Sequence, residues 1–172
     1  GIMVARGDLG VEIRLEVLPR IQRRIIRTCA EMGKRVIVAT HMLESMIENA
    51  MPTRAEVTDV ANAVYEEADA IMLSGETTVG RYPIKCVEIL DRIARSTESS
   101  RGLRFTDNLR LENDKQHIAQ AAVNLAESIS AKAIIVPTRR GRMANLVTNA
   151  NLLGEEVVDN WVEKLSFMTA AV

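Results

Sequence analysis

The stretch Val36-Ile37-Val38-Ala39 is a short apolar run that lies between two others of the same kind, Ile2–Ala5 and 70–73. Runs this short and rich in branched residues are typical of strands buried in a sheet. The segments between them carry apolar residues at steps of three and four, as amphipathic helices do: Leu18, Ile21, Ile25, Cys29 and Met32, then Val57, Val60, Ala61, Val64 and Ala68. This alternation predicts parallel strands with right-handed crossovers, in a sheet buried on both faces.

Local signals predict where the helices begin and end. Gly33 follows the first helical segment and is expected to stop it. Thr53 and Glu56 form a capping box at the start of the second. Pro83 suits the first turn of a third helix, whose apolar residues are Ile84, Val87, Leu90, Ile93 and Ala94. We therefore expect three consecutive βα units in the first half of the chain.

The second half predicts a separate region. Polar residues without periodicity over 96–115 indicate a linker between a first region, 1–95, and a second, 116–172. In the second region we expect a strand over 133–137 and three helices, whose apolar residues are Ile118, Ala121, Ala122, Leu125 and Ile129, then Ala144, Leu146 and Val147, then Val157, Val158, Trp161, Leu165 and Met168. Because the chain opens inside a strand and closes on an apolar run, we expect it to be a piece of a larger protein.

Composition narrows the class of protein. The chain has 172 residues, 47% hydrophobic and 26% charged, with a net charge of -1, which argues against disorder and against bulk attraction to nucleic acid. No apolar run approaches the ~18 residues of a membrane span, and no signal segment opens the chain, so a cytoplasmic protein is expected. Cys29 and Cys86 form no Cys-x-x-Cys pair and are interpreted as inert core thiols, although sequence alone leaves a disulfide open.

Polar residues follow each predicted strand, where parallel sheets bind ligands. Arg6-Gly7-Asp8-Leu9-Gly10 follows the first strand and offers backbone amides and one carboxylate. A single carboxylate suits Mg²⁺, and a turn stabilised by the Asp8 side chain fits the same pattern. Thr40 follows the second strand, as a ligand hydroxyl or as a helix cap.

The third strand is followed by Ser74-Gly75-Glu76-Thr77-Thr78, which alone is a turn. Three such strand ends in succession favour a site for an anionic, metal-bound substrate. His41 lies near this predicted site, whereas His117 has no companion at the spacing of metal ligands. Neither the P-loop nor the dinucleotide-binding glycine motif is present.

Several longer motifs occur in a fixed order along the chain: Gly1-Ile2-Met3-Val4-Ala5-Arg6-Gly7-Asp8-Leu9-Gly10, Val36-Ile37-Val38-Ala39-Thr40 with Met42-Leu43-Glu44-Ser45-Met46, Pro52-Thr53-Arg54-Ala55-Glu56, Asp59-Val60-Ala61-Asn62-Ala63 and Ile71-Met72-Leu73-Ser74-Gly75-Glu76-Thr77. Together these motifs resemble the pyruvate kinase family. The resemblance implies an α/β fold: the last three βα units of a TIM (β/α)8 barrel over 1–95, followed by part of a small α/β C-terminal regulatory domain over 116–172.

The resemblance also implies an activity. Members of the family transfer a phosphoryl group from phosphoenolpyruvate to ADP, giving pyruvate and ATP, with Mg²⁺ and usually K⁺. By position, Asp8 would ligate Mg²⁺, and Gly7, Asp8 and Thr40 would hold the substrate carboxylate. Thr40 and Ser74 would belong to the proton-delivery region, with Glu76 supporting it. The helix after Thr53, with Arg54, would lie where family members pair subunits, and a homotetramer is the family norm.

The chain departs from the family pattern in several places. The phosphate-binding lysine, the second Mg²⁺ carboxylate and the K⁺ ligands come from earlier strands of family members and are not in this sequence, so we expect the isolated chain to be inactive. His41 and Arg14 stand where glutamine and proline are common. The arginine-rich loop 138–143 replaces a hydroxyl-rich loop and argues against sugar-bisphosphate activation. After Asn149 the next strand is missing, although 161–167 resembles the helix that follows it.

Two further readings of the chain stay open. It is either a non-catalytic association module, since three βα units leave open strand edges, or part of another Mg²⁺-dependent barrel enzyme that handles an enolate.

Overall fold

A computed structural model describes residues 1–100, 102–131, 133–137, 139 and 141–150. Its strands form one parallel sheet in the order β1-β2-β3, as the alternating pattern predicts. The strands are β1 (Ile2–Ala5), β2 (Val36–Ala39) and β3 (Ala70–Met72), and the helices of this first region are α1 (Arg6–Glu12), α2 (Leu18–Glu31), α3 (Arg54–Tyr65), α4 (Gly75–Thr78) and α5 (Pro83–Glu98), with short 3-10 turns at Leu15–Val17 and Glu44–Ile47.

The predicted helix signals are confirmed. Thr53 accepts a hydrogen bond from Glu56 N–H while the Glu56 carboxylate accepts from Thr53 N–H, the reciprocal capping box of α3. Pro83 occupies the first turn of α5. Gly33 has a φ of 59° and lies two residues after Glu31, the last residue of α2, where the N–H groups of Gly33 and Lys34 close back on the carbonyls of Ala30 and Cys29. This left-handed termination is the one that glycine favours.

The expectation that both faces of the sheet are buried is wrong for the described residues. One face packs on α2, α3 and α5 through a core that includes Val4, Val38 and Ile26. On the other face Met3, Ile37 and Met72 remain 51%, 37% and 36% exposed. The physical reason is that none of the described elements forms a layer over that face, so apolar strand residues keep contact with solvent.

The second region holds α6 (Asp114–Ser128) and α7 (Arg142–Ala150), which pack on each other through Ala119, Val123, Val147 and Ala150. The strand expected over 133–137 is wrong: this segment has no regular structure, and Ile135 is 89% exposed. It pairs with none of the described strands, so its backbone gains no ladder hydrogen bonds. The final helix predicted beyond Asn149, and the resemblance over 161–167, lie outside the described residues.

The predicted linker contains structure of its own. α5 continues to Glu98, and a 3-10 turn at Phe105–Asn108 follows. The Glu67 carboxylate accepts hydrogen bonds from the N–H groups of Phe105 and Thr106, which ties this segment to the end of α3. The division of the chain at 96–115 stays a prediction.

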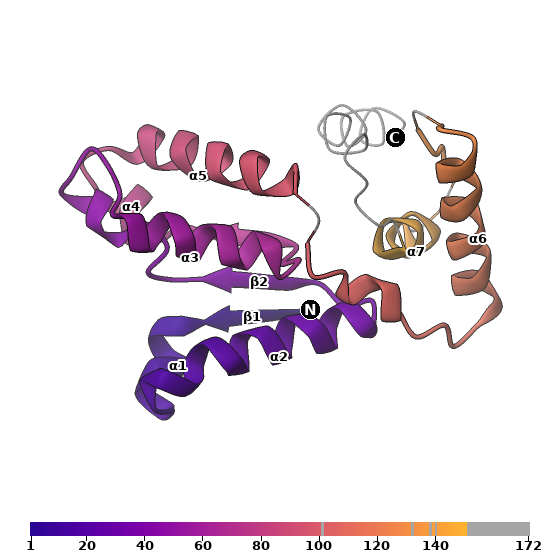
Figure 1. Ribbon diagram of the computed structural model, residues 1–172, viewed down its shortest axis with the longest axis horizontal. Helices are drawn as coiled ribbons and strands as arrows, with labels where there is room; N and C mark the ends of the chain where they lie inside the picture. Colours follow the sequence, from indigo (N-terminus) through magenta and orange to yellow (C-terminus); the bar gives the residue numbers. More distant parts are fainter. Residues whose placement is uncertain (101, 132, 138, 140, 151–172) are drawn as a thin grey trace.

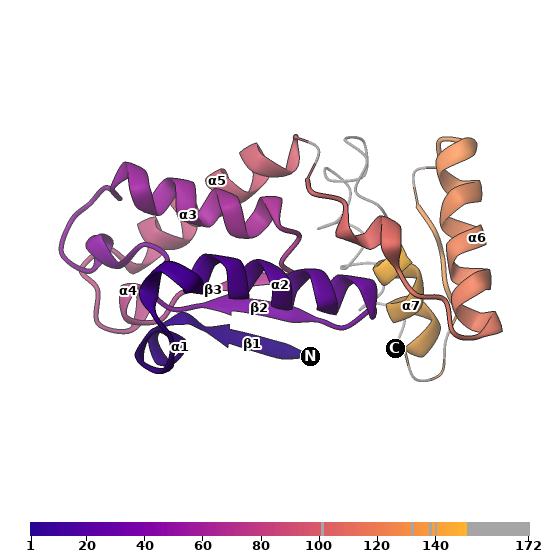
Figure 2. The same cartoon turned by 60° about the horizontal axis from the view of Figure 1, so that its bottom comes forward.

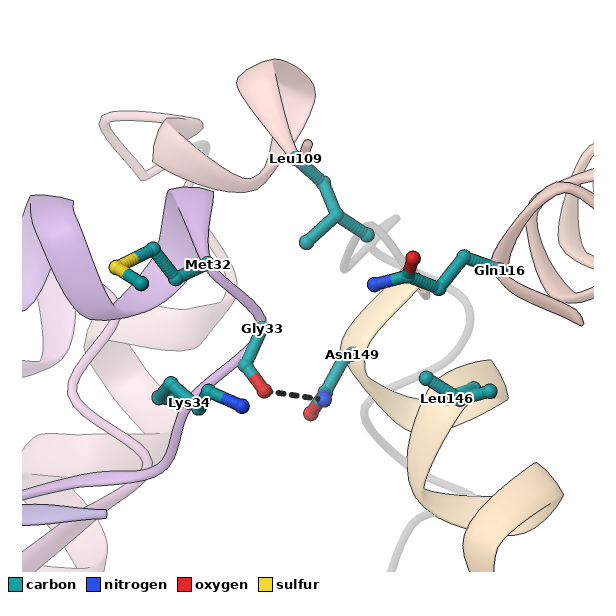
Figure 3. A pocket seen from close by; sticks show the side chains of 7 residues that line it. All are labelled: Met32, Gly33, Lys34, Leu109, Gln116, Leu146 and Asn149. Carbon is teal, nitrogen blue, oxygen red and sulfur yellow. Dashed lines mark hydrogen bonds between the residues drawn. The ribbon is translucent and has the colours of Figure 1, made fainter. Parts of the chain in front are cut away.

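The second region lies beyond the amino ends of the strands, opposite to α1 and α4 (Figures 1 and 2). Asn149 on α7 donates a hydrogen bond of 2.8 Å to the carbonyl of Gly33, at the edge of a small pocket (Figure 3). Arg110 N–H donates to the Glu31 carbonyl beside it. Among the described residues, no helix combines the length and the apolarity that crossing a bilayer requires.

Candidate functional site

The three strand ends lie side by side. In the parallel register Ala5 pairs with Ala39, and Ala39 with Met72, so the residues that follow the strands meet at one edge of the sheet. Figure 1 shows α1 and α4 at this carboxyl edge. The parallel register therefore confirms the prediction that the polar segments after the three strands lie at one edge of the sheet.

Gly7 and Asp8 lie in the first turn of α1 rather than in a loop. Gly7 does not have a positive φ, so its role is close approach: a Cβ there would lie 3.2 Å from His41 Nε2 and 3.5 Å from Thr40 Oγ1. Its N–H donates a hydrogen bond of 2.8 Å to Thr40 Oγ1. This bond joins the first strand end to the second.

Asp8 is exposed and makes no hydrogen bond or ion pair with the described part of the chain. The expected alternative, a turn stabilised by its side chain, therefore does not occur. No group of three or more His, Cys, Asp or Glu side chains that could hold a metal is found among the described residues. Asp8 is the one acidic residue in the first turn of α1, so this turn offers a single carboxylate to a cation.

Thr40 is not a helix cap. The next helical turn begins four residues later at Glu44, and no side chain caps it. Thr40 and His41 both have left-handed backbones, with φ of 70° and 53°, a conformation that costs about 1–2 kcal/mol for each residue with a side chain. The turn points the Thr40 hydroxyl at α1.

Arg6 is a site residue that the sequence analysis missed. Its side chain is 8% exposed and donates to the carbonyls of Thr40 and His41, and it pairs with Asp59 on α3. The only signal in the sequence is a charged residue directly after an apolar strand. Its partner lies 53 positions away, so no local pattern reveals the pair.

Glu76 joins the second and third strand ends. Its carboxylate is 2% exposed and accepts hydrogen bonds from Leu43 N–H at 3.0 Å and Ser74 N–H at 2.8 Å. Burial alone would raise its pKa, but the backbone N–H groups around it outweigh this effect and hold the pKa of Glu76 below its usual value. The ionised Glu76 side chain thus links the loop that follows β2 to the loop that follows β3.

Ser74 occupies the N-cap position of α4 without a side-chain cap. Its carbonyl accepts hydrogen bonds from the hydroxyls of Thr77 and Thr78. Within the described ranges its hydroxyl has no hydrogen-bond partner and makes no bond to Thr40, so the two hydroxyls share an edge without touching.

His41 lies beside Gly7, as its position after the second strand predicts. Its Nδ1 is 2.5 Å from Glu44 Oε2, while its side chain stays 54% exposed. The ring is therefore oriented from one nitrogen, and Nε2 faces the Gly7 backbone.

Glu56 is a second residue whose tertiary role the sequence did not reveal. Beyond its capping bonds, it accepts from Ser45 N–H at 2.6 Å and from the Ser45 hydroxyl at 2.5 Å. Burial opposes ionisation, but the bonds from Ser45 and Thr53 prevail and lower the pKa of Glu56. This carboxylate fixes the loop after Thr40 to the start of α3.

The remaining predicted features lie away from this edge. Cys29 and Cys86 are free and buried, and burial raises the pKa of both thiols, as expected of inert core residues. In the arginine-rich loop, Thr138 and Arg140 lie outside the described residues, while Gly141 has a left-handed φ of 71° ahead of α7.

The chain is similar in sequence to several pyruvate kinases. The family model described as "Pyruvate kinase, barrel domain" matches residues 1–87. The pyruvate kinase of Thermotoga maritima is 46% identical over 152 residues, which are 88% of this chain and 33% of that protein. The pyruvate kinase of Methanocaldococcus jannaschii is 42% identical over 154 residues, again 88% of this chain and 34% of that protein.

A solved structure agrees with the sequence matches. The crystal structure of a pyruvate kinase from Cryptosporidium parvum superposes with a TM-score of 0.83 at 38% identity, covering 91% of this chain and 34% of that one. The three βα units therefore correspond to part of a TIM-type barrel, which confirms the predicted fold class. The chain spans about a third of the length of these relatives, and its match to the family's barrel domain over half of its residues places it in the pyruvate kinase family.

Proposed function

We propose that this chain supplies the substrate-carboxylate side of a pyruvate kinase active site, in an enzyme that transfers a phosphoryl group from phosphoenolpyruvate to ADP. The observation that carries the proposal is the hydrogen bond between Gly7 N–H and Thr40 Oγ1, with Asp8 next in the same helical turn. A carboxylate placed between these groups would accept from both the amide and the hydroxyl. We place this enzyme in glycolysis and in the cytoplasm.

Asp8 fits a divalent cation. Its carboxylate is exposed and has no partner among the described residues, and Mg²⁺ typically takes one or two protein carboxylates with substrate oxygens and water. When bound, Mg²⁺ would stabilise negative charge on the transferring phosphoryl group and the enolate oxygen. We assign the K⁺ ligands and the phosphate-binding lysine to other parts of the barrel, because the family resemblance places them on earlier strands.

Thr40 and Ser74 are the proposed hydroxyls of the proton-delivery region. Thr40 follows β2 and Ser74 follows β3, so both lie at the carboxyl edge of the sheet, where α1 and α4 begin. Glu76 acts on them indirectly, because its carboxylate fixes the backbone of Ser74 and of Leu43. We propose no direct contact of Glu76 with substrate.

A chimera tests the proposal. Residues 1–150 of this chain replace the matching segment of the Thermotoga maritima pyruvate kinase, which supplies the remaining barrel. We expect Mg²⁺-dependent formation of pyruvate from phosphoenolpyruvate and ADP within about a hundredfold of the parent enzyme, since the reacting groups act only when all are positioned together. A folded tetrameric chimera without turnover would contradict the proposal, and turnover with another enolate-forming substrate but not with phosphoenolpyruvate would favour a different barrel enzyme.

The exposed apolar sheet face favours a second function, that of an association module. Met3, Ile37 and Met72 are exposed apolar side chains on one face of the sheet, and exposed apolar patches mark association sites. Fragment complementation separates the two functions: a complementary barrel fragment that restores turnover supports the enzyme, and self-association without turnover supports the module.

A further inference from the structure

We propose that Arg6 is a positioning residue that sets the turn at Thr40 and His41, and with it the place of the Thr40 hydroxyl, while Asp59 anchors Arg6 to α3. The inference rests on the function proposed above, since the position of Thr40 matters to catalysis only if the carboxylate of phosphoenolpyruvate binds there. No other described side chain makes hydrogen bonds to both carbonyls of this turn.

The Arg6 side chain donates hydrogen bonds to both carbonyl oxygens of the turn. Nε and Nη2 donate to the Thr40 carbonyl at 3.0 and 2.6 Å, and Nη2 also donates to the His41 carbonyl at 2.8 Å. The guanidinium is a rigid planar fork, so donors at fixed angles specify where the two oxygens point. A lysine ammonium in the same place has no such fork.

The turn needs this support because its backbone is unfavourable. Thr40 and His41 are consecutive left-handed residues, whereas Glu67, Arg104 and Ser130, the other non-glycine residues with positive φ in the described part of the chain, occur singly. Such conformations persist only where the surroundings impose them. Arg6 is the group that imposes the conformation here.

Asp59 completes the arrangement from another element. Arg6 Nη1 lies 2.5 Å from Asp59 Oδ2, and Arg6 is 8% exposed. A buried guanidinium left without its carboxylate would be costly, so Asp59 keeps the fork in place. Because Arg6 directly precedes Gly7 in the first turn of α1, one residue controls both partners of the hydrogen bond between Gly7 N–H and Thr40 Oγ1.

Hydrogen exchange of glycine amides tests this in the 172-residue chain labelled with ¹⁵N-glycine. Gly33 and Gly80 donate to Ala30 and Gly75 within unrelated turns and serve as internal references. In Arg6→Lys we expect the Gly7 amide to exchange at least about tenfold faster, with both references within about twofold, because only the local turn is released. Arg35→Lys, which replaces the guanidinium that pairs with Asp69 at the opposite end of the strands, is the control and is expected to leave Gly7 unchanged.

Rescue distinguishes positioning from general support. Adding His41→Gly to Arg6→Lys removes one left-handed side chain, so we expect Gly7 exchange to return to within about threefold of the starting chain. No recovery, or no acceleration in Arg6→Lys, overturns the proposal. If Arg6→Lys accelerates all three glycines alike, Asp59→Asn decides: selective acceleration of Gly7 supports positioning, and uniform or absent acceleration overturns it.

Kinetics of the chimera carry the inference to catalysis. In Arg6→Lys we expect KM for phosphoenolpyruvate to rise at least about tenfold while KM for ADP stays within about twofold, since only the carboxylate side is disturbed. Equal increases in both would contradict a positioning role. A chimera that is inactive before any substitution refutes the proposed function alone, because glycine exchange in the 172-residue chain still decides the role of Arg6.

Discussion

Asp8 is the residue on which the proposed metal chemistry depends. We expect Asp8→Asn in the chimera to lower turnover with phosphoenolpyruvate by at least about a hundredfold, because an anionic ligand is replaced by a neutral amide in a site where the metal supplies several kcal/mol of stabilisation. Thermal unfolding should change little, since Asp8 is exposed and makes no contact that the fold needs. Asp91→Asn, on the exposed face of α5, is the matched control. Near-normal turnover of Asp8→Asn at saturating Mg²⁺ would reject the metal role.

Thr40 tests the carboxylate cradle. Thr40→Val replaces the hydroxyl by a methyl group of similar shape, so the Gly7 N–H loses its acceptor. We expect KM for phosphoenolpyruvate to rise, or ketonisation of enolpyruvate to slow, by about tenfold or more, measured in steady-state assays of each half-reaction. Thr58→Val, which removes a hydroxyl bonded to the Arg54 carbonyl within α3, controls for loss of a threonine. Unchanged values in both assays would leave Thr40 with a structural role only.

At the scale of elements, Glu76 ties two loops by charge. Its pKa is lower in the folded chain than the value of about 4.3 of a free glutamate, so its stabilising contribution is complete above that pH and is lost as pH falls through the folded pKa. We expect Glu76→Gln to cost about 2 kcal/mol at pH 7, because an amide cannot accept from both Leu43 and Ser74 equally well. The difference from the unsubstituted chain should shrink below pH 4.

Urea unfolding at several pH values measures this effect. Glu88→Gln, a change at an exposed position of α5, is the control and should leave both the stability and its pH dependence near those of the unsubstituted chain. A cost for Glu76→Gln that stays constant from pH 7 to pH 3 would show that packing, rather than the charge, accounts for it.

The strands and first-region helices could be predicted from sequence because their signals are local. Thr53 and Glu56 are three residues apart, and Gly33 ends a periodic segment, so the capping box and the left-handed stop are visible in short windows. The segment 133–137 shows the limit. Its apolar composition is that of a strand, but a strand also needs a neighbour, and within the described ranges it has none.

Some features of the candidate site could likewise be predicted from the sequence, and others could not. The polar residues after each strand were predictable from position, because parallel strands bring their carboxyl ends together. The pair of Arg6 with Asp59, the left-handed backbone of Thr40 and the contact of Glu76 with Leu43 were not, since each depends on segments far apart in sequence. Family resemblance named Asp8, Thr40, Ser74 and Glu76, and their roles stay predictions.

At the scale of the whole molecule, the sheet has two edge strands, β1 and β3, and one face with exposed apolar side chains. We expect the isolated 172 residues to show no pyruvate kinase activity, because phosphoryl transfer requires every charged group to be positioned at once and this chain supplies one metal carboxylate. We also expect self-association, since Met3, Ile37 and Met72 are exposed at strand positions. A coupled assay with phosphoenolpyruvate, ADP, Mg²⁺ and K⁺ beside light scattering checks both. Turnover within about tenfold of the Thermotoga enzyme, or a stable dilute monomer, would refute the respective part.

The hydrogen bond from Asn149 to the Gly33 carbonyl has a consequence for how the two ends of the sheet can change. Gly33 precedes β2, whereas Thr40 follows it, so the junction with the second region and the proposed chemistry sit at opposite ends of one strand. Sites separated in this way, with no shared partner, generally contribute additively to stability. We therefore expect substitutions at Asn149, in the junction at the amino ends, and substitutions at the carboxyl ends to change the free energy of unfolding independently of each other.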